Sequence, residues 1–237
     1  MTRQGADSGA NALDILARMP RINAWIYSRF AAHVRGRVLE VGSGIGNVSA
    51  HLVKDSESVL LTDVEPGYLR ALERRFADQR GAEVARYDLE REPPAIVKRT
   101  PFDAVLAVNV IEHLADDARA VRTLARLLAP NGNLLICVPA MPFAYGALDE
   151  ALGHYRRYTR RSLERLLRLA GLEPGPVRYM NLPGLVGWLL HGRVLGRRSL
   201  PRRQVAAFEK VVPLVAAIDR VPWPLGLSVY ACARKPR

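Results

Sequence analysis

Cysteine is scarce in this sequence, which has only Cys137 and Cys232, each within an apolar stretch. Two such residues exclude a disulfide framework and a cysteine-rich metal site, and they indicate buried free thiols in a reducing compartment. Long apolar runs are also lacking, since no stretch reaches the roughly 18 residues of a membrane-spanning helix. The first residues are small and polar, unlike a secretory signal. We therefore expect a cytoplasmic protein.

Acidic side chains are nearly absent from the last third of the chain. Residues 151–237 hold 17 basic and 4 acidic side chains, whereas residues 1–150 hold 18 basic and 19 acidic ones. The net charge of +12 therefore lies in the last third. Only four of the basic residues are lysine, so a general preference for arginine could explain the basic character. Such a preference would also make the first 150 residues basic, which they are not. We interpret the asymmetry as a preference for an anionic substrate, a lipid surface with possible peripheral membrane contact, or a polyanion.

Short β-branched runs alternate with longer helical stretches from residue 38 onward. This rhythm is typical of a mostly parallel sheet whose faces are covered by helices. Strands are predicted at 38–41, 59–62, 83–87, 104–108, 134–138, 177–180 and 227–233. Helices are predicted at 12–18, 21–33, 66–77 and 205–218, and after the caps Asp116 and Thr159; Pro130-Asn131-Gly132 is predicted to turn into the fifth strand.

The domain organisation follows from this order of elements. The 237 residues suffice for one α/β domain. We expect a single domain whose parts are N-terminal helices at 1–35, a core at 36–180, a helical lid or substrate insertion at 181–222, and a last strand within 223–237.

The first predicted strand runs into Gly42-Ser43-Gly44-Ile45-Gly46. Glycine lets the backbone approach a ligand closely, and a following helix presents free N–H groups. The third glycine comes one residue earlier than in the dinucleotide fingerprint. Glu40, inside the strand, suits a cationic ligand with ammonium and sulfonium groups better than a pyrophosphate. Such turns also occur at ordinary strand–helix junctions, so further residues must support a nucleotide site.

Two more acids end the next two predicted strands. Asp63 can accept both hydroxyls of a ribose, as acids at this position do in dinucleotide folds. Asp88 can accept from an adenine amino group while Leu89 offers its backbone N–H. Because α/β sheets bind ligands at the carboxyl edge of their strands, three acids at three successive strand ends predict a nucleotide site there.

Five stretches together resemble the class I S-adenosylmethionine-dependent methyltransferases, in the small-molecule and quinone-biosynthesis branch. The resemblance covers roughly residues 36–180 and the last strand. The stretches begin at residues 38, 61, 87, 102 and 109 and read VLEVGSGIG, LTDVEP, YDL, FDAV and NVIEHL.

The resemblance implies a Rossmann-like fold with a seven-stranded, mostly parallel sheet whose last strand is antiparallel. It also implies S-adenosylmethionine as cofactor and S-adenosylhomocysteine as product. The glycine loop and Glu40 would hold the methionine end of the cofactor, and Asn109 would lie beside the reacting methyl group. The cofactor residues expected from sequence and resemblance together are Glu40, Gly42, Ser43, Gly44, Gly46, Asp63, Val64, Asp88, Leu89 and Asn109.

Two histidines are candidates for the catalytic base that an oxygen acceptor requires. His113 follows the fourth strand and His154 follows the fifth, so both belong to the substrate edge; each is alternatively a loop residue that orients backbone. Some methyltransferases that resemble this chain hold a divalent ion with two acids and a histidine at this turn. Because Asn109 replaces the first acid, we expect no metal.

The acceptor itself is less defined by the sequence. Tyr155, Arg156, Arg157 and Tyr158 are predicted to bind substrate, because arginine suits phosphate or carboxylate. A small-molecule or lipid-linked anionic acceptor, methylated on oxygen or nitrogen, is the favoured interpretation. Nucleic acid is disfavoured, since the motif of amine-methylating enzymes is missing after the fourth strand. The alternatives are an RNA methyltransferase, a nicotinamide-dependent oxidoreductase and a catalytically silent relative.

Overall fold

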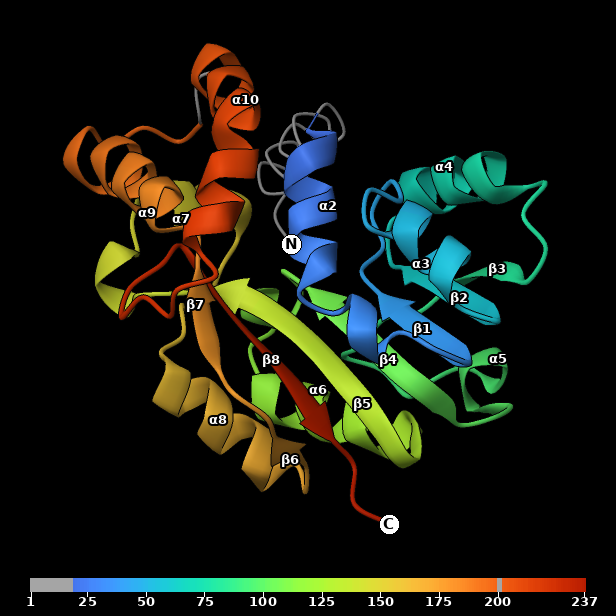
Figure 1. Ribbon diagram of the computed structural model, residues 1–237. Coiled ribbons are helices and arrows are strands. Elements are labelled where there is room, and N and C mark those ends of the chain that lie inside the picture. Colours follow the sequence, from blue (N-terminus) through green and yellow to red (C-terminus); the bar gives the residue numbers. More distant parts are fainter. Residues whose placement is uncertain (1–18, 200–201) are drawn as a thin grey trace.

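A single sheet forms the centre of the computed structural model, which describes residues 19–199 and 202–237 (Figure 1). The strands lie in the order β3-β2-β1-β4-β5-β8-β6, and β7 also pairs with β8. Their bounds are Arg37–Val41 (β1), Ser58–Asp63 (β2), Ala82–Arg86 (β3), Phe102–Val108 (β4), Leu128–Pro139 (β5), Glu173–Pro174 (β6), Arg178–Met180 (β7) and Ser228–Arg234 (β8). Strands β1 to β5 are parallel, and β8 is antiparallel to β5, β6 and β7. The predicted parallel sheet with an antiparallel last strand is confirmed.

Helices cover both faces of the sheet (Figure 1). The α-helices are Pro20–Ser28 (α2), Ser49–Asp55 (α3), Pro66–Phe76 (α4), Ala95–Lys98 (α5), Asp117–Leu127 (α6), Ala147–Leu152 (α7), Arg160–Leu169 (α8), Leu182–Trp188 (α9) and Arg202–Ile218 (α10). Short 3-10 turns lie at Ala31–His33 (η1), Ile111–His113 (η2) and Pro142–Ala144 (η3), and a π-helical turn at Leu189–Val194 (η4).

The core has two halves, one on each face of the sheet. Neighbouring residues of β4 alternate between them: Val105 packs with α5, α6 and α8, whereas Leu106 packs with α2, α3, α4 and α10. Both side chains are fully buried. A strand buried on both faces is expected where helices cover both sides of a parallel sheet. The continuous apolar runs in the sequence reflect this arrangement.

The predicted helix caps are present. Asp116 accepts from the backbone N–H of Arg119 over 2.8 Å, and Thr159 accepts from that of Ser162 over 3.0 Å. Both bonds satisfy N–H groups that have no partner inside a helix. Pro66 starts α4, and Gly171, with φ of 78°, follows the end of α8. The signals at these helix ends therefore predicted the structure correctly.

Several predicted boundaries are wrong. The helix at 21–33 ends at Ser28, because Arg29 and Phe30 donate to carbonyls three residues back, which tightens the last turn. Asn131 and Gly132 do not form a separate turn: they exchange hydrogen bonds with Lys235 and belong to an irregular part of β5. The predicted sixth strand at 177–180 is present as β7, but the sequence analysis missed the short strand β6, which is separated from β7 by a stretch that contains Pro176, a residue with no N–H to donate.

The insertion contains more regular structure than predicted. Beside the expected helix, which begins at Arg202, it holds α9 and η4. Helix α10 lies against α2 (Figure 1), where Glu209 accepts from the first backbone N–H groups of α2. The helix predicted at 12–18 lies outside the described residues. Within the described part of the chain, no helix combines the length and the apolar character needed to cross a membrane.

Candidate active site

The glycine loop after β1 has a backbone that only glycine adopts easily. Gly42, Gly44 and Gly46 have φ of 70°, 55° and 84°, in the left-handed region that L side chains avoid. A Cβ atom on Gly42 would lie 2.6 Å from Cγ2 of Val110, and one on Gly46 would lie 2.7 Å from Cε2 of Phe76. The glycines therefore allow the left-handed backbone of the loop and also leave room for the neighbouring side chains of Val110 and Phe76.

Glu40 lies behind this loop with almost no exposed surface. Its carboxylate accepts a short hydrogen bond from the hydroxyl of Ser49. Burial raises the pKa of Glu40 to about 7, although hydrogen bonds from Ser49 and Ser43 act in the opposite direction. A cation beside this carboxylate would favour its charged form. Ser43, the predicted cofactor residue in the loop, accepts from the N–H of Thr62 over 3.2 Å.

Asp63 holds the glycine loop in place from the end of β2. Its Oδ2 accepts from the N–H of Gly44 over 2.8 Å, and its Oδ1 accepts from the N–H groups of Val64 and Glu65 over 2.7 and 3.0 Å. A carboxylate has about four acceptor positions, so these three bonds leave one. Val64, also a predicted cofactor residue, is 38% exposed beside it.

The remaining predicted cofactor residues lie at the ends of β3 and β4. Asp88 accepts from the N–H of Glu90 over 3.0 Å and pairs with Arg91 at 3.3 Å, while the side chain of Leu89 is buried in the core. Asn109 is exposed, has φ of 53°, and donates its N–H to the carbonyl of Cys137 on β5. All predicted cofactor residues thus gather along the carboxyl ends of β1 to β4.

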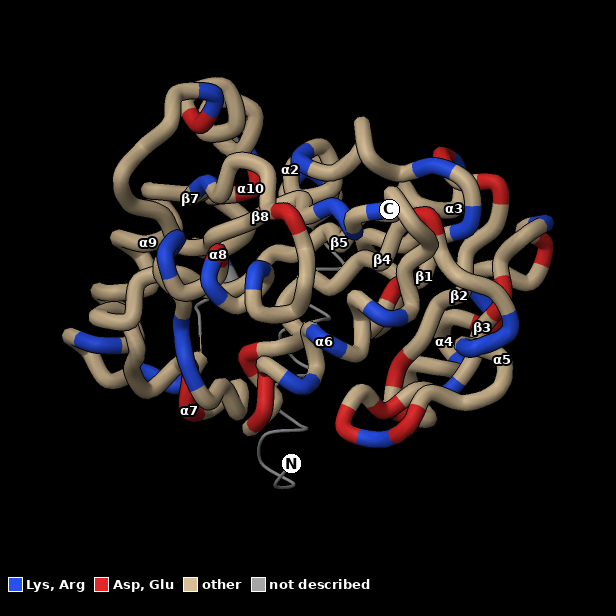
Figure 2. The backbone as a smooth tube through the Cα atoms, turned by 90° about the horizontal axis from the view of Figure 1, so that it is seen from below, with Lys and Arg blue, Asp and Glu red and all other residues tan. Residues whose placement is uncertain are grey.

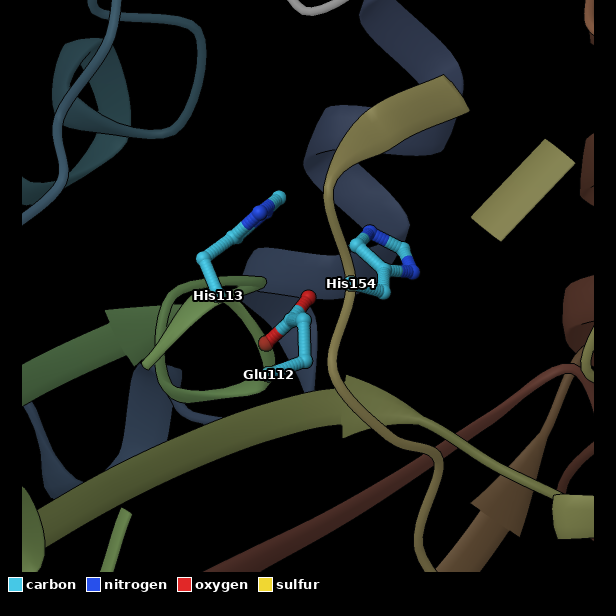
Figure 3. Close-up of side chains that lie close together, drawn as sticks. All are labelled: Glu112, His113 and His154. Carbon is cyan, nitrogen blue, oxygen red and sulfur yellow. The ribbon is translucent and has the colours of Figure 1, made fainter. Parts of the chain in front are cut away.

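The two candidate histidines meet at this edge. The rings of His113 and His154 lie edge to face, with centroids 4.7 Å apart. Figure 3 shows His113 and Glu112 on the turn after β4, with His154 on the segment that faces them. Burial and, to a smaller extent, the neighbouring His154 lower the pKa of His113 to about 4.

Glu112 completes this cluster and is fully buried. Neither carboxylate oxygen has a hydrogen-bond partner from another residue that the structure describes. Burial raises the pKa of Glu112 to about 8. One ligand-type atom from each of Glu112, His113 and His154 lies within 4.8 Å of the others. The sequence predicted the position of the histidines but not the isolation of this carboxylate.

Asp149 is a residue that the sequence analysis missed. It is fully buried at the start of α7, and its Oδ1 accepts from Nδ1 of His154 over 2.9 Å and from Nε of Arg157 over 2.7 Å. Its Oδ2 accepts from Nε1 of Trp188 over 3.1 Å. Burial alone would raise the pKa of Asp149, but the hydrogen bonds and charges of His154 and Arg157 outweigh it and leave the pKa lowered. No motif marks an acid inside a helical stretch, so only the structure reveals this network.

The predicted substrate segment is largely engaged within the protein. Arg157 is buried between Asp149 and the ring of Trp188, and the buried Tyr158 donates to Asp117 over 2.7 Å. Arg156 also pairs with Asp117, at 3.0 Å. Tyr155, by contrast, is 61% exposed. Substrate binding by this segment stays a prediction, and Tyr155 is the member best placed for it.

Comparisons with known proteins identify the family of the chain. A family model described as a methyltransferase domain matches residues 15–175. The ubiquinone biosynthesis O-methyltransferase of Ralstonia nicotianae is 28% identical over 177 residues, which cover 69% of this chain and 73% of that enzyme. Its counterpart from Xylella fastidiosa is 34% identical over 105 residues, covering 42% of this chain and 40% of that enzyme.

A solved structure adds support for the fold. The N-methyltransferase NodS from Bradyrhizobium japonicum, in complex with S-adenosyl-L-homocysteine, has a TM-score of 0.54 at 16% identity, covering 85% of this chain and 79% of that one. Since the family model matches more than half of the chain, the family assignment follows. The chain belongs to the class I S-adenosylmethionine-dependent methyltransferases.

Proposed function

We propose that this enzyme methylates an oxygen or nitrogen atom of a small-molecule or lipid-linked, anionic acceptor. The observation that carries the proposal is the meeting of His113 and His154 at the carboxyl edge, beside the exposed Asn109. The basic last third of the chain supports an anionic acceptor. The names of the ubiquinone O-methyltransferase relatives favour oxygen as the methylated atom.

The cofactor residues have proposed roles along this edge. Glu40 and the glycine loop bind the methionine end of S-adenosylmethionine, and the free acceptor position of Asp63 binds a ribose hydroxyl. Asp88 and the N–H of Leu89 bind adenine, and Asn109 lies beside the sulfonium methyl. Methyl transfer is an in-line displacement, so the main task of these residues is to hold the methyl carbon in front of the acceptor atom.

The histidine pair has the proposed catalytic role of assisting the loss of the acceptor proton. Nδ1 of His154 is engaged with Asp149, which leaves Nε2 as the ring nitrogen for the acceptor side. The pair acts directly or through an ion held beside it.

A turnover screen tests the proposal. S-adenosylhomocysteine release is measured with phenolic, sugar and lipid-phosphate acceptors, each with hydroxyl and amine versions. We expect turnover with an anionic hydroxyl acceptor, and a strong loss of kcat but unchanged cofactor affinity in H113A and H154A. H51A is the control, because the His51 ring stacks on Tyr27, whereas the rings of His113 and His154 contact each other. Normal turnover in both H113A and H154A would exclude a catalytic role for the two histidines.

A lipid surface is the proposed source of the acceptor. Val186, Val194 and Leu214, on α9, η4 and α10, are all more than 60% exposed. The exposed Arg193, Arg197 and Arg198 lie among them in the chain. Apolar side chains beside basic ones suit an anionic membrane. Figure 2 shows where the basic residues lie along the backbone, including those on α8.

Co-sedimentation with vesicles tests this surface. We expect the protein to bind vesicles that contain anionic lipid and to be released by salt, and we expect weaker binding in a variant with Arg193, Arg197 and Arg198 replaced by Gln. Equal binding to neutral and anionic vesicles would contradict the proposal. Salt-sensitive binding of RNA in place of vesicles would favour the RNA methyltransferase alternative.

A further inference from the structure

The buried carboxylate of Glu112 lies beside two histidine rings and has no hydrogen-bond partner from another described residue. A buried carboxylate without a hydrogen-bond partner is costly, and among the described residues both of its oxygens lack a partner from another residue. The neighbours that face it are two imidazoles, His113 and His154. Imidazole nitrogens and a carboxylate oxygen are the ligands that a divalent transition-metal ion prefers.

His154 also carries the outer contact that metal-binding histidines usually show. A ligating imidazole normally donates its other ring N–H to a carboxylate or a backbone carbonyl, which fixes the ring. Asp149 supplies this contact to Nδ1 of His154 over 2.9 Å. The Nε2 atom of His154 is therefore left for a ligand.

We infer that Glu112, His113 and His154 form a binding site for a divalent transition-metal ion of the zinc type. The set of two nitrogens and one oxygen favours such an ion over magnesium, which prefers oxygen ligands and an octahedral shell. Three protein ligands leave an open position for an acceptor oxygen, as in catalytic zinc sites. The ligand atoms lie within 4.8 Å of one another, so they draw together by about 1 Å on binding to reach bonds of about 2.0–2.2 Å.

The charges around the site fit a dication. Asp149 and the ionised form of Glu112 contribute two negative charges, and Arg157, paired with Asp149, contributes one positive charge. With neutral histidines the site carries one net negative charge, and a dication changes it to one positive charge. An ionised acceptor oxygen would neutralise that charge, so the ion favours the reactive form of a hydroxyl acceptor. This role in turnover rests on the proposed function, whereas binding of the ion does not.

The sequence analysis expected no metal because Asn109 replaces an acid at the turn after β4. The third ligand, His154, lies 41 residues beyond His113 in the chain. Only the pairing of β4 with β5 brings the segments after both strands together. The site therefore differs from the two-acid arrangement considered from the sequence.

Metal binding is tested without cofactor or acceptor. The purified chain is stripped with a chelator and titrated with Zn²⁺, and with Co²⁺ as a visible spectroscopic probe. We expect one ion per chain, cobalt bands of nitrogen and oxygen ligation, and at least tenfold weaker binding in H113A, H154A and E112Q. H51A is the matched histidine control and should bind as the unmodified protein does. Circular dichroism verifies that each variant is folded.

The possible results distinguish a failure of the metal-site inference from a failure of the proposed function. No ion uptake by the unmodified chain, or uptake that folded H154A and E112Q retain in full, would overturn the inference. Competition by millimolar Mg²⁺ at equal strength would overturn the assignment to a zinc-type ion. One bound ion without turnover on any anionic acceptor would contradict the proposed function and leave the metal site standing.

Discussion

Asp63 accepts a hydrogen bond from the backbone N–H of Gly44 over 2.8 Å, so the end of β2 fixes the loop that follows β1. The same carboxylate binds the first two N–H groups beyond its own strand. One side chain thus shapes two segments of the cofactor edge and retains an acceptor position for the ligand. Loop geometry and the proposed ribose recognition are therefore coupled at this residue.

Replacing Asp63 with Asn tests this coupling. An amide N–H would face one of the N–H donors, so we expect the free energy of unfolding to fall by about 1–3 kcal/mol. Affinity for S-adenosylmethionine should fall at least about tenfold, because charge-assisted bonds are lost. Urea denaturation and calorimetry measure the two effects. D78N, at an exposed acid beyond α4, is the control, and equal cofactor affinities for the two variants would remove Asp63 from the ribose site.

Glu40 should make cofactor affinity depend on pH. Its pKa in the cofactor-free protein is about 7, and the proposed contact with the ammonium group of the cofactor requires the ionised form. From pH 6 to pH 8 the ionised fraction rises about tenfold, so affinity should rise by about the same factor. Calorimetry at both pH values measures this rise, which E40Q should abolish. A pH-independent affinity in the unmodified protein would contradict the role of Glu40.

The same carboxylate should affect stability in the opposite direction. Its pKa in the folded protein, about 7, lies above the ordinary value of 4.5 for a glutamate, so protonation stabilises the fold. This contribution is complete below pH 4.5 and is lost as the pH rises through about 7. Denaturation of the cofactor-free protein between pH 5 and 8 should therefore show a decline that is smaller in E40Q. Parallel curves for both proteins would disprove this linkage.

A set of three glycine substitutions separates backbone strain from steric overlap. Gly42 has positive φ and a close Val110, Gly171 has positive φ and no atom within 4 Å of a new Cβ, and Gly67 has neither. We expect G42A to lose the most stability, G171A to lose about 1 kcal/mol, and G67A to gain up to about 1 kcal/mol. Thermal and chemical denaturation rank the three. A G42A loss no larger than that of G171A would show that Val110 moves aside.

Asp149 should be important for stability. Its removal in D149A leaves Arg157 buried without its partner, which is expected to cost about 3–5 kcal/mol. E150A is the matched control, since Glu150 is exposed and its pair with Arg198 is long at 3.9 Å; we expect a loss below about 1 kcal/mol. The double variant D149L/R157M should recover much of the stability. Equal losses in D149A and E150A would refute the importance of the buried pair.

Local sequence signals predicted much of the fold. Caps at Asp116 and Thr159 and the proline at Pro66 depend on a few neighbouring residues, and the structure confirms all three. The boundary at Asn131 was wrong because pairing with Lys235, more than 100 residues away, keeps this stretch in the sheet. Such a partner leaves no local trace in the sequence.

In the candidate site, too, some residues could be predicted from the sequence and others depend on contacts between distant parts of the chain. Glu40, Asp63 and Asp88 could be placed on one edge because parallel strands bring their carboxyl ends together. The environment of Glu112 could not be predicted, since its burial depends on how the segment 149–158 folds over it. The contact of Trp188 with Asp149 joins residues 39 positions apart and depends on the path of the insertion.

Strand β8 has a consequence for how the chain is made. It lies between β5 and the pair β6 and β7, and it hydrogen-bonds to all three. During synthesis β5 therefore emerges from the ribosome nearly 90 residues before its partner, and the N–H and C=O groups along that edge stay unpaired until β8 follows. An unpaired edge of this kind can pair with another chain before the fold is complete.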